Sequence, residues 1–215
     1  MDIKEFKKLP IMGILRGIKM DRLDELVSAI LSSGLKTIEL AMNTYKAPQI
    51  LAKIVELSGK KLIVGAGTVL TVDDLKKALD NGAGFIVMPT LAVDVVQYCA
   101  KNKIPVFAGA LTPQEIYNAW CLGASMVKVF PAKFFGPEYF REIKGPFPQI
   151  ELLACGGVNI KNIGLFFSNG ASAVAFGASI FRKDWIASGQ FLRIQESIKA
   201  LIDSKDKGPS QIFFI

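Results

Sequence analysis

A lysine and a glutamate occupy short apolar segments in which charged side chains are unusual. Lys128 lies in MVKVF at residues 126–130, and Glu39 lies in TIELAM at residues 37–42. If both segments are β-strands, their two-residue period places the two valines on one face and Lys128 on the other. The same period separates Glu39 from its isoleucine and leucine neighbours. The alternation therefore predicts that both ionisable side chains point into the interior of the fold.

An interior lysine beside a carboxylate suits Schiff-base chemistry. Burial of an ammonium group is costly unless the group is paired or loses its proton, so we expect the pKa of Lys128 to be lowered. A neutral amine can attack a ketone, and Glu39 can carry the protons that the formation and hydrolysis of a Schiff base require. Two alternatives stay open from the alternation alone. Lys128 can reach solvent from the strand end, or the two residues can form only a structural ion pair.

The composition narrows the chemistry further. The 215 residues include no histidine, which excludes Ser/His/Asp and Cys/His nucleophile pairs and HExxH zinc sites. The three cysteines are odd in number and form no CxxC motif, so a complete disulfide framework is impossible and a reducing cytoplasm is predicted. Catalysis must therefore use Lys, Glu, Asp, Tyr, Cys or backbone groups.

The charge pattern favours a small anionic ligand. The net charge is +7, but the lysines are scattered singly or in pairs, without a basic helix or interleaved aromatic residues. This distribution argues against a nucleic-acid partner. The N-terminal MDIKEFKKLP mixes both charge signs and does not resemble a secretory signal. The uncharged residues 164–181 contain glycines, serines and an asparagine, so we interpret them as buried strand and loop and expect no membrane span.

Short apolar segments recur along the chain with helical-period segments between them. Strands that are apolar at nearly every position must be covered on both faces, as in parallel sheets wrapped by helices. We therefore predict an α/β fold, a single (βα)8 TIM-barrel domain over residues 1–215 with a short N-terminal helix; an open doubly wound sheet is the alternative. The predicted strands are residues 11–17, 37–42, 62–67, 84–88, 105–110, 126–131, 151–155 and 173–177.

Helix boundaries follow from capping residues. Thr71 and Thr112 are predicted N-caps, each with an acidic residue three positions later, as in a capping box. Glycines 34, 59, 82, 123 and 170 each follow a helical segment, as a left-handed C-terminal cap requires. We also predict helices over residues 21–33 and about 184–204. The tail at about 205–215 ends in four apolar residues, and whether it is mobile or docks on the barrel stays open.

Residues after the predicted strands form the candidate mouth of the barrel. Arg16 ends the first strand, where a guanidinium can bind a carboxylate or phosphate or form a rim salt bridge. The glycines at 156–157 and the GAS at 177–179 follow the seventh and eighth strands, where barrel enzymes commonly bind phosphate. Tight turns explain one such glycine cluster more easily than two, so we favour a phosphate site. GAGT at 65–68 gives a weaker signal of the same kind.

The motifs together resemble those of the class I aldolases of the KDPG/KHG family. ILRG, the glutamate of IELAMN, GAGTVL, VKVFPA followed by FGPEYF, GGV and GAS occur in the family's order over nearly the whole chain. These enzymes cleave 2-keto-3-deoxy-6-phospho-sugar acids. The resemblance implies a (βα)8 barrel that usually assembles as a homotrimer, without a metal or an organic cofactor.

The resemblance also implies roles for individual residues. Lys128 would form the Schiff base, and Glu39 would be the general acid/base, acting through water. Thr68 would hold the pyruvyl carboxylate, Arg16 would contact the anionic substrate, and Pro89 and Phe130 would line the pocket. The 6-phosphate would be bound by Gly156, Gly157, Gly177, Ala178 and Ser179. The products would be pyruvate and D-glyceraldehyde 3-phosphate.

Two positions depart from the family pattern. Asn43 stands where many members carry an arginine for the substrate carboxylate, so binding there would depend more on Thr68 and Arg16. Cys155 precedes GGV where gluconate-type enzymes resemble TGG, which affects recognition of the C4 configuration. The choice between gluconate and galactonate substrates stays open. Two other functions also stay open. One is cleavage of 4-hydroxy-2-oxoglutarate, and the other is a phosphate-binding barrel that acts as an epimerase or a metabolite sensor.

Overall fold

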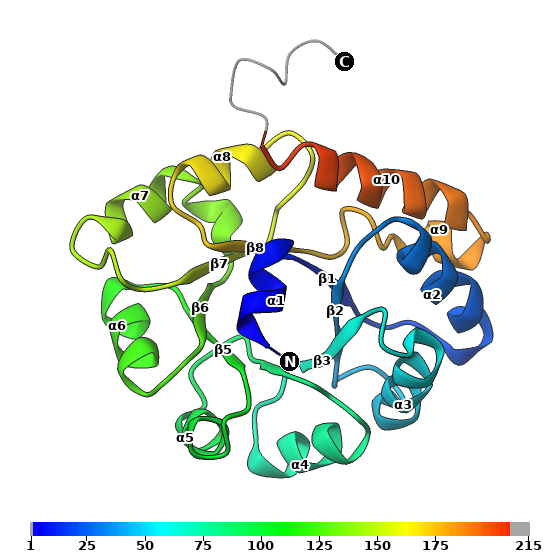
Figure 1. The fold of residues 1–215 in the computed structure, drawn as a ribbon, viewed down its shortest axis with the longest axis horizontal. Coiled ribbons are helices and arrows are strands. Elements are labelled where there is room, and N and C mark those ends of the chain that lie inside the picture. Colours follow the sequence, from blue (N-terminus) through cyan, green and yellow to red (C-terminus); the bar gives the residue numbers. More distant parts are fainter. Residues whose placement is uncertain (1, 207–215) are drawn as a thin grey trace.

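The chain folds as a closed barrel, which confirms the predicted class and excludes the open sheet (Figure 1). The computed structural model describes residues 2–206, and within them eight parallel strands pair in sequence order until β8 returns to β1. The strands are β1 Ile11–Leu15, β2 Thr37–Ala41, β3 Ile63–Gly67, β4 Ile86–Val87, β5 Val106–Ala110, β6 Met126–Val129, β7 Leu152–Cys155 and β8 Ala173–Phe176.

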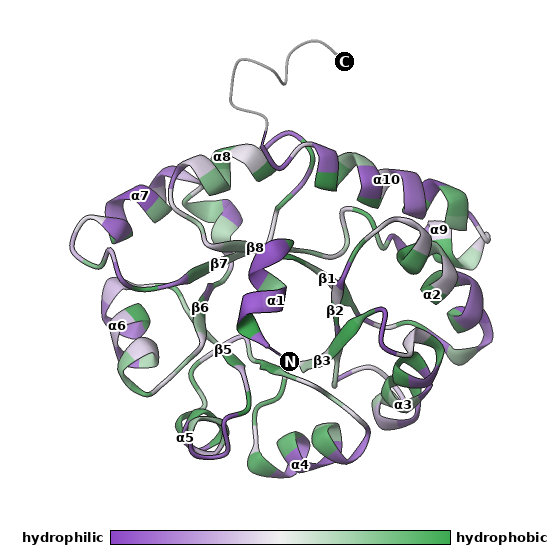
Figure 2. Cartoon of the chain, viewed as in Figure 1, coloured by the Kyte–Doolittle hydropathy of each residue, from purple (hydrophilic) through white to green (hydrophobic). Residues whose placement is uncertain are grey.

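Helices form the outer layer and cover the barrel with their apolar faces. Figure 2 shows hydrophobic residues along the strands and mixed faces on the surrounding helices. The α-helices are α1 Ile3–Lys8, α2 Leu23–Ser32, α3 Ala47–Ser58, α4 Val72–Asp80, α5 Val93–Lys101, α6 Pro113–Cys121, α7 Glu138–Lys144, α8 Ile163–Ser168, α9 Lys183–Ala187 and α10 Phe191–Asp203. Two 3-10 turns, η1 Met20–Arg22 and η2 Ala132–Phe134, follow β1 and β6.

The predicted caps form, with one difference. The Thr112 hydroxyl accepts the Glu115 backbone N–H, and the Glu115 carboxylate accepts the Thr112 N–H, which completes a capping box. The Thr71 hydroxyl accepts the Asp74 N–H, but it donates its own proton to the Asp74 carboxylate, so the box there is incomplete. The five glycines predicted to end helices all have positive φ.

Three predicted segments differ in the structure. The helix expected over residues 21–33 begins as the 3-10 turn η1 and becomes α-helical only at Leu23. The long final helix is divided into α9 and α10, because the chain breaks at Gly189, whose φ is +72°. Residues 164–181 include most of α8 as well as β8, and no helix within residues 2–206 is long and apolar enough to cross a membrane. Most of the tail, residues 207–215, lies outside the described residues.

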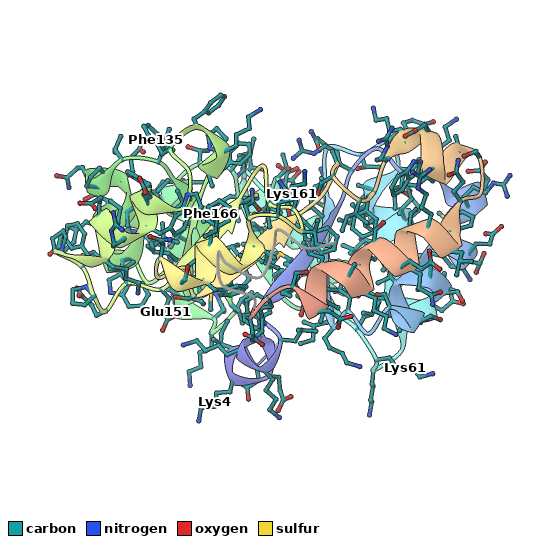
Figure 3. The ribbon with its side chains drawn as sticks, turned by 90° about the horizontal axis from the view of Figure 1, so that it is seen from above. Lys4, Lys61, Phe135, Glu151, Lys161 and Phe166 are labelled. Atoms are coloured by element: carbon teal, nitrogen blue, oxygen red, sulfur yellow. The ribbon has the colours of Figure 1, made fainter. Side chains whose placement is uncertain are left out.

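The short helix α1 closes the end of the barrel where the strands begin. Phe6 of α1 is 1% exposed, and its ring lies 5.6 Å from that of Phe107 inside the barrel. Lys7 forms a 2.8 Å ion pair with Glu151 at the start of β7. Figure 3 shows α1, with Lys4, projecting from this end, while Phe135 lies toward the other. The carboxyl ends of the strands are therefore the end that is open to a ligand.

Candidate active site

Lys128 and Glu39 meet inside the barrel, as the alternation predicts. Their side chains are 6% and 1% exposed, and Lys128 Nζ lies 3.7 Å from Glu39 Oε1. The neighbouring Val127 and Val129 belong to the layer between strands and helices. Lys128 therefore does not reach solvent, which excludes that alternative. The pair spans the barrel from β6 to β2, which are not neighbours in the sheet.

Burial and mutual attraction compete in setting the protonation of the pair. Burial raises the pKa of Glu39, and the nearby Lys128 and Arg16 cations oppose that shift only in part. Burial lowers the pKa of Lys128, but the charge of the Glu39 carboxylate and a hydrogen bond to the Cys155 sulfur more than offset this effect, so the pKa of Lys128 is raised. The expected lowering of the Lys128 pKa is therefore wrong for the unliganded pair. A protonated amine is not nucleophilic, and Glu39 is the carboxylate close enough to accept a proton from Lys128.

The second carboxylate oxygen of Glu39 is free to act. Among the described protein groups, Oε2 is buried and has no hydrogen-bond partner. Gly67 makes room for this carboxylate, because a Cβ at that position would lie 2.6 Å from Oε1. Gly65 similarly makes room for the ring of Phe85. Gly67 thus serves packing around Glu39 and Gly65 serves packing around Phe85, while Glu39 Oε2 remains an acceptor for water or a substrate hydroxyl.

Arg16 and Thr68 form the adjoining part of the mouth. Arg16 follows β1, and its Nη2 donates to Thr68 Oγ1 at 3.4 Å. Thr68 follows β3 with φ of +57°, a conformation rare for a β-branched residue. A strained backbone of this kind is frequent at functional sites. Arg16 acts electrostatically on both Glu39 and Lys128, so a guanidinium and a hydroxyl lie beside the ion pair.

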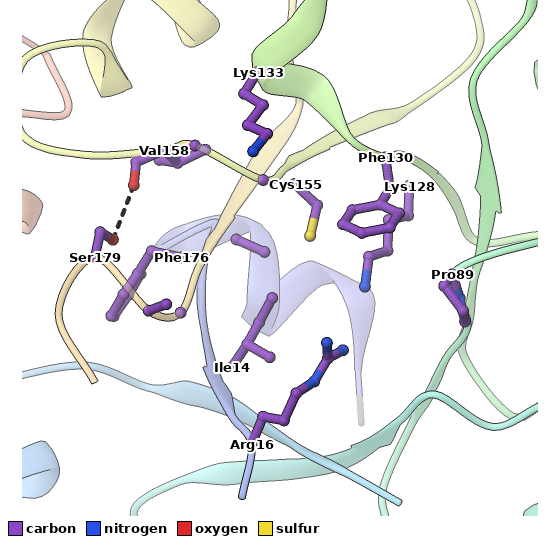
Figure 4. Close-up of a pocket in the computed structure, with 15 residues that line it drawn as sticks. Ile14, Arg16, Pro89, Lys128, Phe130, Lys133, Cys155, Val158, Phe176 and Ser179 are labelled. Atoms are coloured by element: carbon purple, nitrogen blue, oxygen red, sulfur yellow. Dashed lines mark hydrogen bonds between the residues drawn. The ribbon is translucent and has the colours of Figure 1, made fainter. Parts of the chain in front are cut away.

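A cavity of about 480 Å³ opens above Lys128 and contains most of the predicted site (Figure 4). The predicted residues that line it are Arg16, Pro89, Lys128, Phe130, Gly156, Gly157, Gly177, Ala178 and Ser179. Glu39 contacts this set through Lys128, and Thr68 contacts it through Arg16. Asn43 is exposed in the turn after β2 and is not among the lining residues. The structure thus brings together eleven of the twelve predicted positions.

The two late glycine loops face each other across one side of the cavity. Gly156 and Gly157 have φ of +97° and +87°, which an L side chain rarely adopts. The Ser179 hydroxyl donates to the Val158 carbonyl at 3.1 Å and joins the two loops. Backbone amides and a hydroxyl at this position are suited to an anion.

Six further lining residues were not among the predicted site residues: Ile14, Lys133, Cys155, Val158, Ala175 and Phe176. Ile14 and Ala175 sit at strand positions whose two-residue period points inward, so that signal was available. Lys133 lies in η2, where no period applies. Burial raises the pKa of the Cys155 thiol, which lies within hydrogen-bonding reach of Lys128. Cys155 is therefore a protonated, weakly polar neighbour of the amine. Within residues 2–206 no three His, Cys, Asp or Glu side chains cluster as a metal site.

Known proteins are similar to this chain in sequence and in fold. The family model "KDPG and KHG aldolase" matches residues 3–197. The 2-dehydro-3-deoxy-6-phosphogalactonate aldolase of Escherichia coli K12 is 31% identical over 176 residues, 81% of this chain and 86% of the relative. The 2-dehydro-3-deoxy-phosphogluconate aldolase of Treponema pallidum is 26% identical over 193 residues, 88% of this chain and 91% of the relative.

A solved structure agrees with the sequence matches. The structure described as native KDPGal superposes with a TM-score of 0.85 at 29% identity, and the alignment covers 92% of this chain and 94% of the other. The family match extends over both ends of the Glu39–Lys128 pair and both late glycine loops. The resemblance drawn from the motifs is thereby confirmed. The chain belongs to the KDPG and KHG aldolase family and is an aldolase, a carbon–carbon lyase.

Proposed function

We propose that this chain is a class I aldolase that cleaves 2-dehydro-3-deoxy-6-phosphogalactonate or its gluconate isomer to pyruvate and D-glyceraldehyde 3-phosphate. The observation that carries the proposal is the buried pair at the base of the cavity, with Lys128 Nζ 3.7 Å from Glu39 Oε1. The names of the relatives supply the substrate class. Cleavage of 4-hydroxy-2-oxoglutarate is the alternative within the family.

The Lys128–Glu39 pair can perform the proton transfers in sequence. Lys128 passes a proton to Glu39, and the neutral amine attacks the C2 ketone to give a carbinolamine. Loss of water, with Glu39 as acid, leaves an iminium that accepts the electron pair of the C3–C4 bond. Glu39 takes the C4 hydroxyl proton through water as the aldehyde leaves. The enamine is then protonated at C3, and hydrolysis releases pyruvate and regenerates the amine.

The remaining proposed residues hold the two anionic ends of the substrate. Arg16 and Thr68 adjoin the reacting pair and suit the pyruvyl carboxylate. Gly156, Gly157, Gly177, Ala178 and Ser179 would bind the 6-phosphate, and Pro89 and Phe130 would form apolar walls of the cavity. Asn43, which the resemblance adds to the carboxylate site, is exposed and outside the cavity lining. We also propose that residues 1–215 form one domain that assembles as a homotrimer in the cytoplasm, as the resemblance implies.

Borohydride trapping tests the mechanism directly. The protein is incubated with pyruvate and reduced, and the added mass is mapped by peptide mass spectrometry. We expect one adduct, on Lys128, and none in Lys128→Arg, because arginine cannot supply a neutral amine. Lys144 is an internal control: burial lowers its pKa, but its Nζ donates to the carbonyls of Pro148 and Ile150.

The adduct position decides between chemical classes. An adduct on Lys144 would mean that a lowered pKa alone selects the amine. Adducts spread over surface lysines would mean that trapping is unspecific. Either outcome would leave the Lys128–Glu39 pair as a structural ion pair. Binding of a sugar phosphate without any adduct would favour a metabolite sensor, and interconversion of isomers would favour an epimerase. Either result would overturn the proposed aldolase mechanism.

A further inference from the structure

The proposed phosphate loops carry no charged side chain. Gly156, Gly157, Gly177, Ala178 and Ser179 offer backbone amides and one hydroxyl. A phosphate monoester carries a charge of about −1.5 to −2 at neutral pH. Neutral amides alone leave most of that charge without a nearby cation, so the residues that border these loops are the place to look for one.

Lys133 is placed on that side of the cavity by local packing. It lies in η2, five positions after Lys128 on the same segment, and its side chain lines the cavity. The backbone at Gly157 approaches it so closely that a Cβ at Gly157 would lie 2.6 Å from Lys133 Cβ. Gly157 therefore permits both a positive φ and the approach of Lys133. Figure 4 shows Lys133 reaching from the loop after β6 toward the loop between Cys155 and Val158.

The charges around the cavity leave Lys133 available for a ligand. None of the described lining residues is acidic, and in residues 2–206 Lys133 forms no ion pair. Its Nζ lies 5.0 Å from the centre of the exposed Phe134 ring, a contact that does not neutralise it. Lys128 is paired with Glu39, and Arg16 bonds Thr68 on the opposite side of the cavity. Lys133 and Arg16 thus lie on opposite sides of the cavity, a suitable arrangement for a substrate with two anionic ends.

We propose that Lys133 binds the phosphate of the substrate and sets the preference of the enzyme for phosphorylated over unphosphorylated sugar acids. This inference rests on the proposed aldolase function. The charged end of the flexible Lys133 side chain approaches the phosphate from η2, while the two glycine loops bind the phosphate through their backbone amides. It acts on binding and takes no part in proton transfer at Lys128.

Steady-state kinetics with matched substrates tests the proposal. In Lys133→Met, we expect kcat/KM for 2-dehydro-3-deoxy-6-phosphogalactonate to fall by roughly ten- to a hundredfold, mainly through KM. The same acid without its phosphate should react with unchanged kcat/KM. Lys133→Arg should retain most of the activity, because it keeps the charge. The increase of KM with ionic strength should be weaker in Lys133→Met than in the wild type.

Lys161 provides the control. It is exposed at the same end of the barrel, in the segment between Val158 and α8, but does not line the cavity (Figure 3). Lys161→Met should leave kcat/KM unchanged for both the phosphorylated and the unphosphorylated substrate. Equal losses on phosphorylated and unphosphorylated substrates, or no loss in Lys133→Met, would overturn the role of Lys133.

Pyruvate trapping separates this outcome from failure of the aldolase proposal. Pyruvate has no phosphate, so borohydride should still fix it to Lys128 in Lys133→Met. Normal trapping together with an unchanged KM would reject only the Lys133 inference. Absence of trapping in the wild type would reject the aldolase mechanism itself.

Discussion

The two ends of the barrel interior are built on the same strand alternation but contain different residues. Toward the start of the strands, Phe85, Phe107 and Met126 are fully buried, and Phe6 of α1 covers them. One inward position further along, Met126 is followed by Lys128, which pairs in register with Gly109. The change from aromatic rings to a charged residue beside glycine therefore occurs within one two-residue step of a strand.

We expect this difference to separate stability from chemistry along the barrel axis. The aromatic end is filled by rings whose centroids lie 5.6 Å apart, and we expect their packing to stabilise the fold. At the other end, glycines take the place of inward side chains, as Gly67 does beside Glu39. The space that they leave admits a ligand and keeps the ion pair within reach of it. Substitutions at the two ends should accordingly affect different measurements.

The largest effect is expected at Lys128. Lys128→Ala should lower kcat/KM by roughly ten-thousandfold or more, because the covalent step has no substitute nucleophile. Glu39 can take up a proton when its partner is lost, since burial already raises its pKa, so the fold should persist. Turnover assays together with circular dichroism and thermal melting measure both effects. Near-normal turnover in Lys128→Ala would show that Lys128 and Glu39 form only a structural ion pair.

Phe107 provides the opposite case at the aromatic end. Phe107→Ala should lower the free energy of unfolding by about 3–5 kcal/mol, through the cavity left between Phe6 and Phe85. The KM of the molecules that remain folded should stay near that of the wild type. Phe107→Leu keeps an apolar side chain and should lower the free energy of unfolding by less than Phe107→Ala does. Denaturant titration measures the stability, and a large rise in KM for Phe107→Leu would argue against the separation of the two ends.

Glu39→Gln should affect both turnover and the pH dependence of stability. Glu39→Gln should reduce kcat roughly a hundredfold, because the proton acceptor is lost.

Burial raises the pKa of Glu39 above its ordinary value of 4.5, so the folded state holds the Glu39 proton more tightly than the unfolded state. The free energy of unfolding contributed by Glu39 is therefore fully present below pH 4.5 and is lost as pH rises through the folded-state pKa.

Denaturant titrations of wild type and Glu39→Gln across pH measure this contribution. Glutamine resembles the protonated acid, so the variant should lack the decline, and its stability relative to wild type should increase as pH rises above 4.5. A difference in stability that does not vary with pH would mean that the Glu39 proton is held equally in both states.

Strand alternation was enough to predict the inward positions of Lys128 and Glu39, because the two-residue period is a local property of each strand. The raised pKa of Lys128 was not predictable in this way. It depends on a 3.7 Å approach between β2 and β6, which face each other across the closed barrel. Lys133 was missed because η2 has no period that assigns a face to its residues. The break at Gly189 depends on a positive φ in a segment whose sequence is otherwise compatible with a continuous helix.

The smallest effect is expected at Asn43, which the family resemblance places in the carboxylate site. Its side chain is exposed in the turn after β2, so Asn43→Ala should change kcat/KM by less than about twofold. Arg16→Ala, at the mouth itself, should lower it by about tenfold, because a charge-assisted contact to the substrate is lost. Parallel kinetics of the two variants compare these positions. A loss in Asn43→Ala as large as that in Arg16→Ala would mean that the turn after β2 closes over the substrate, and that the polar end of the barrel extends to residues that are exposed without a ligand.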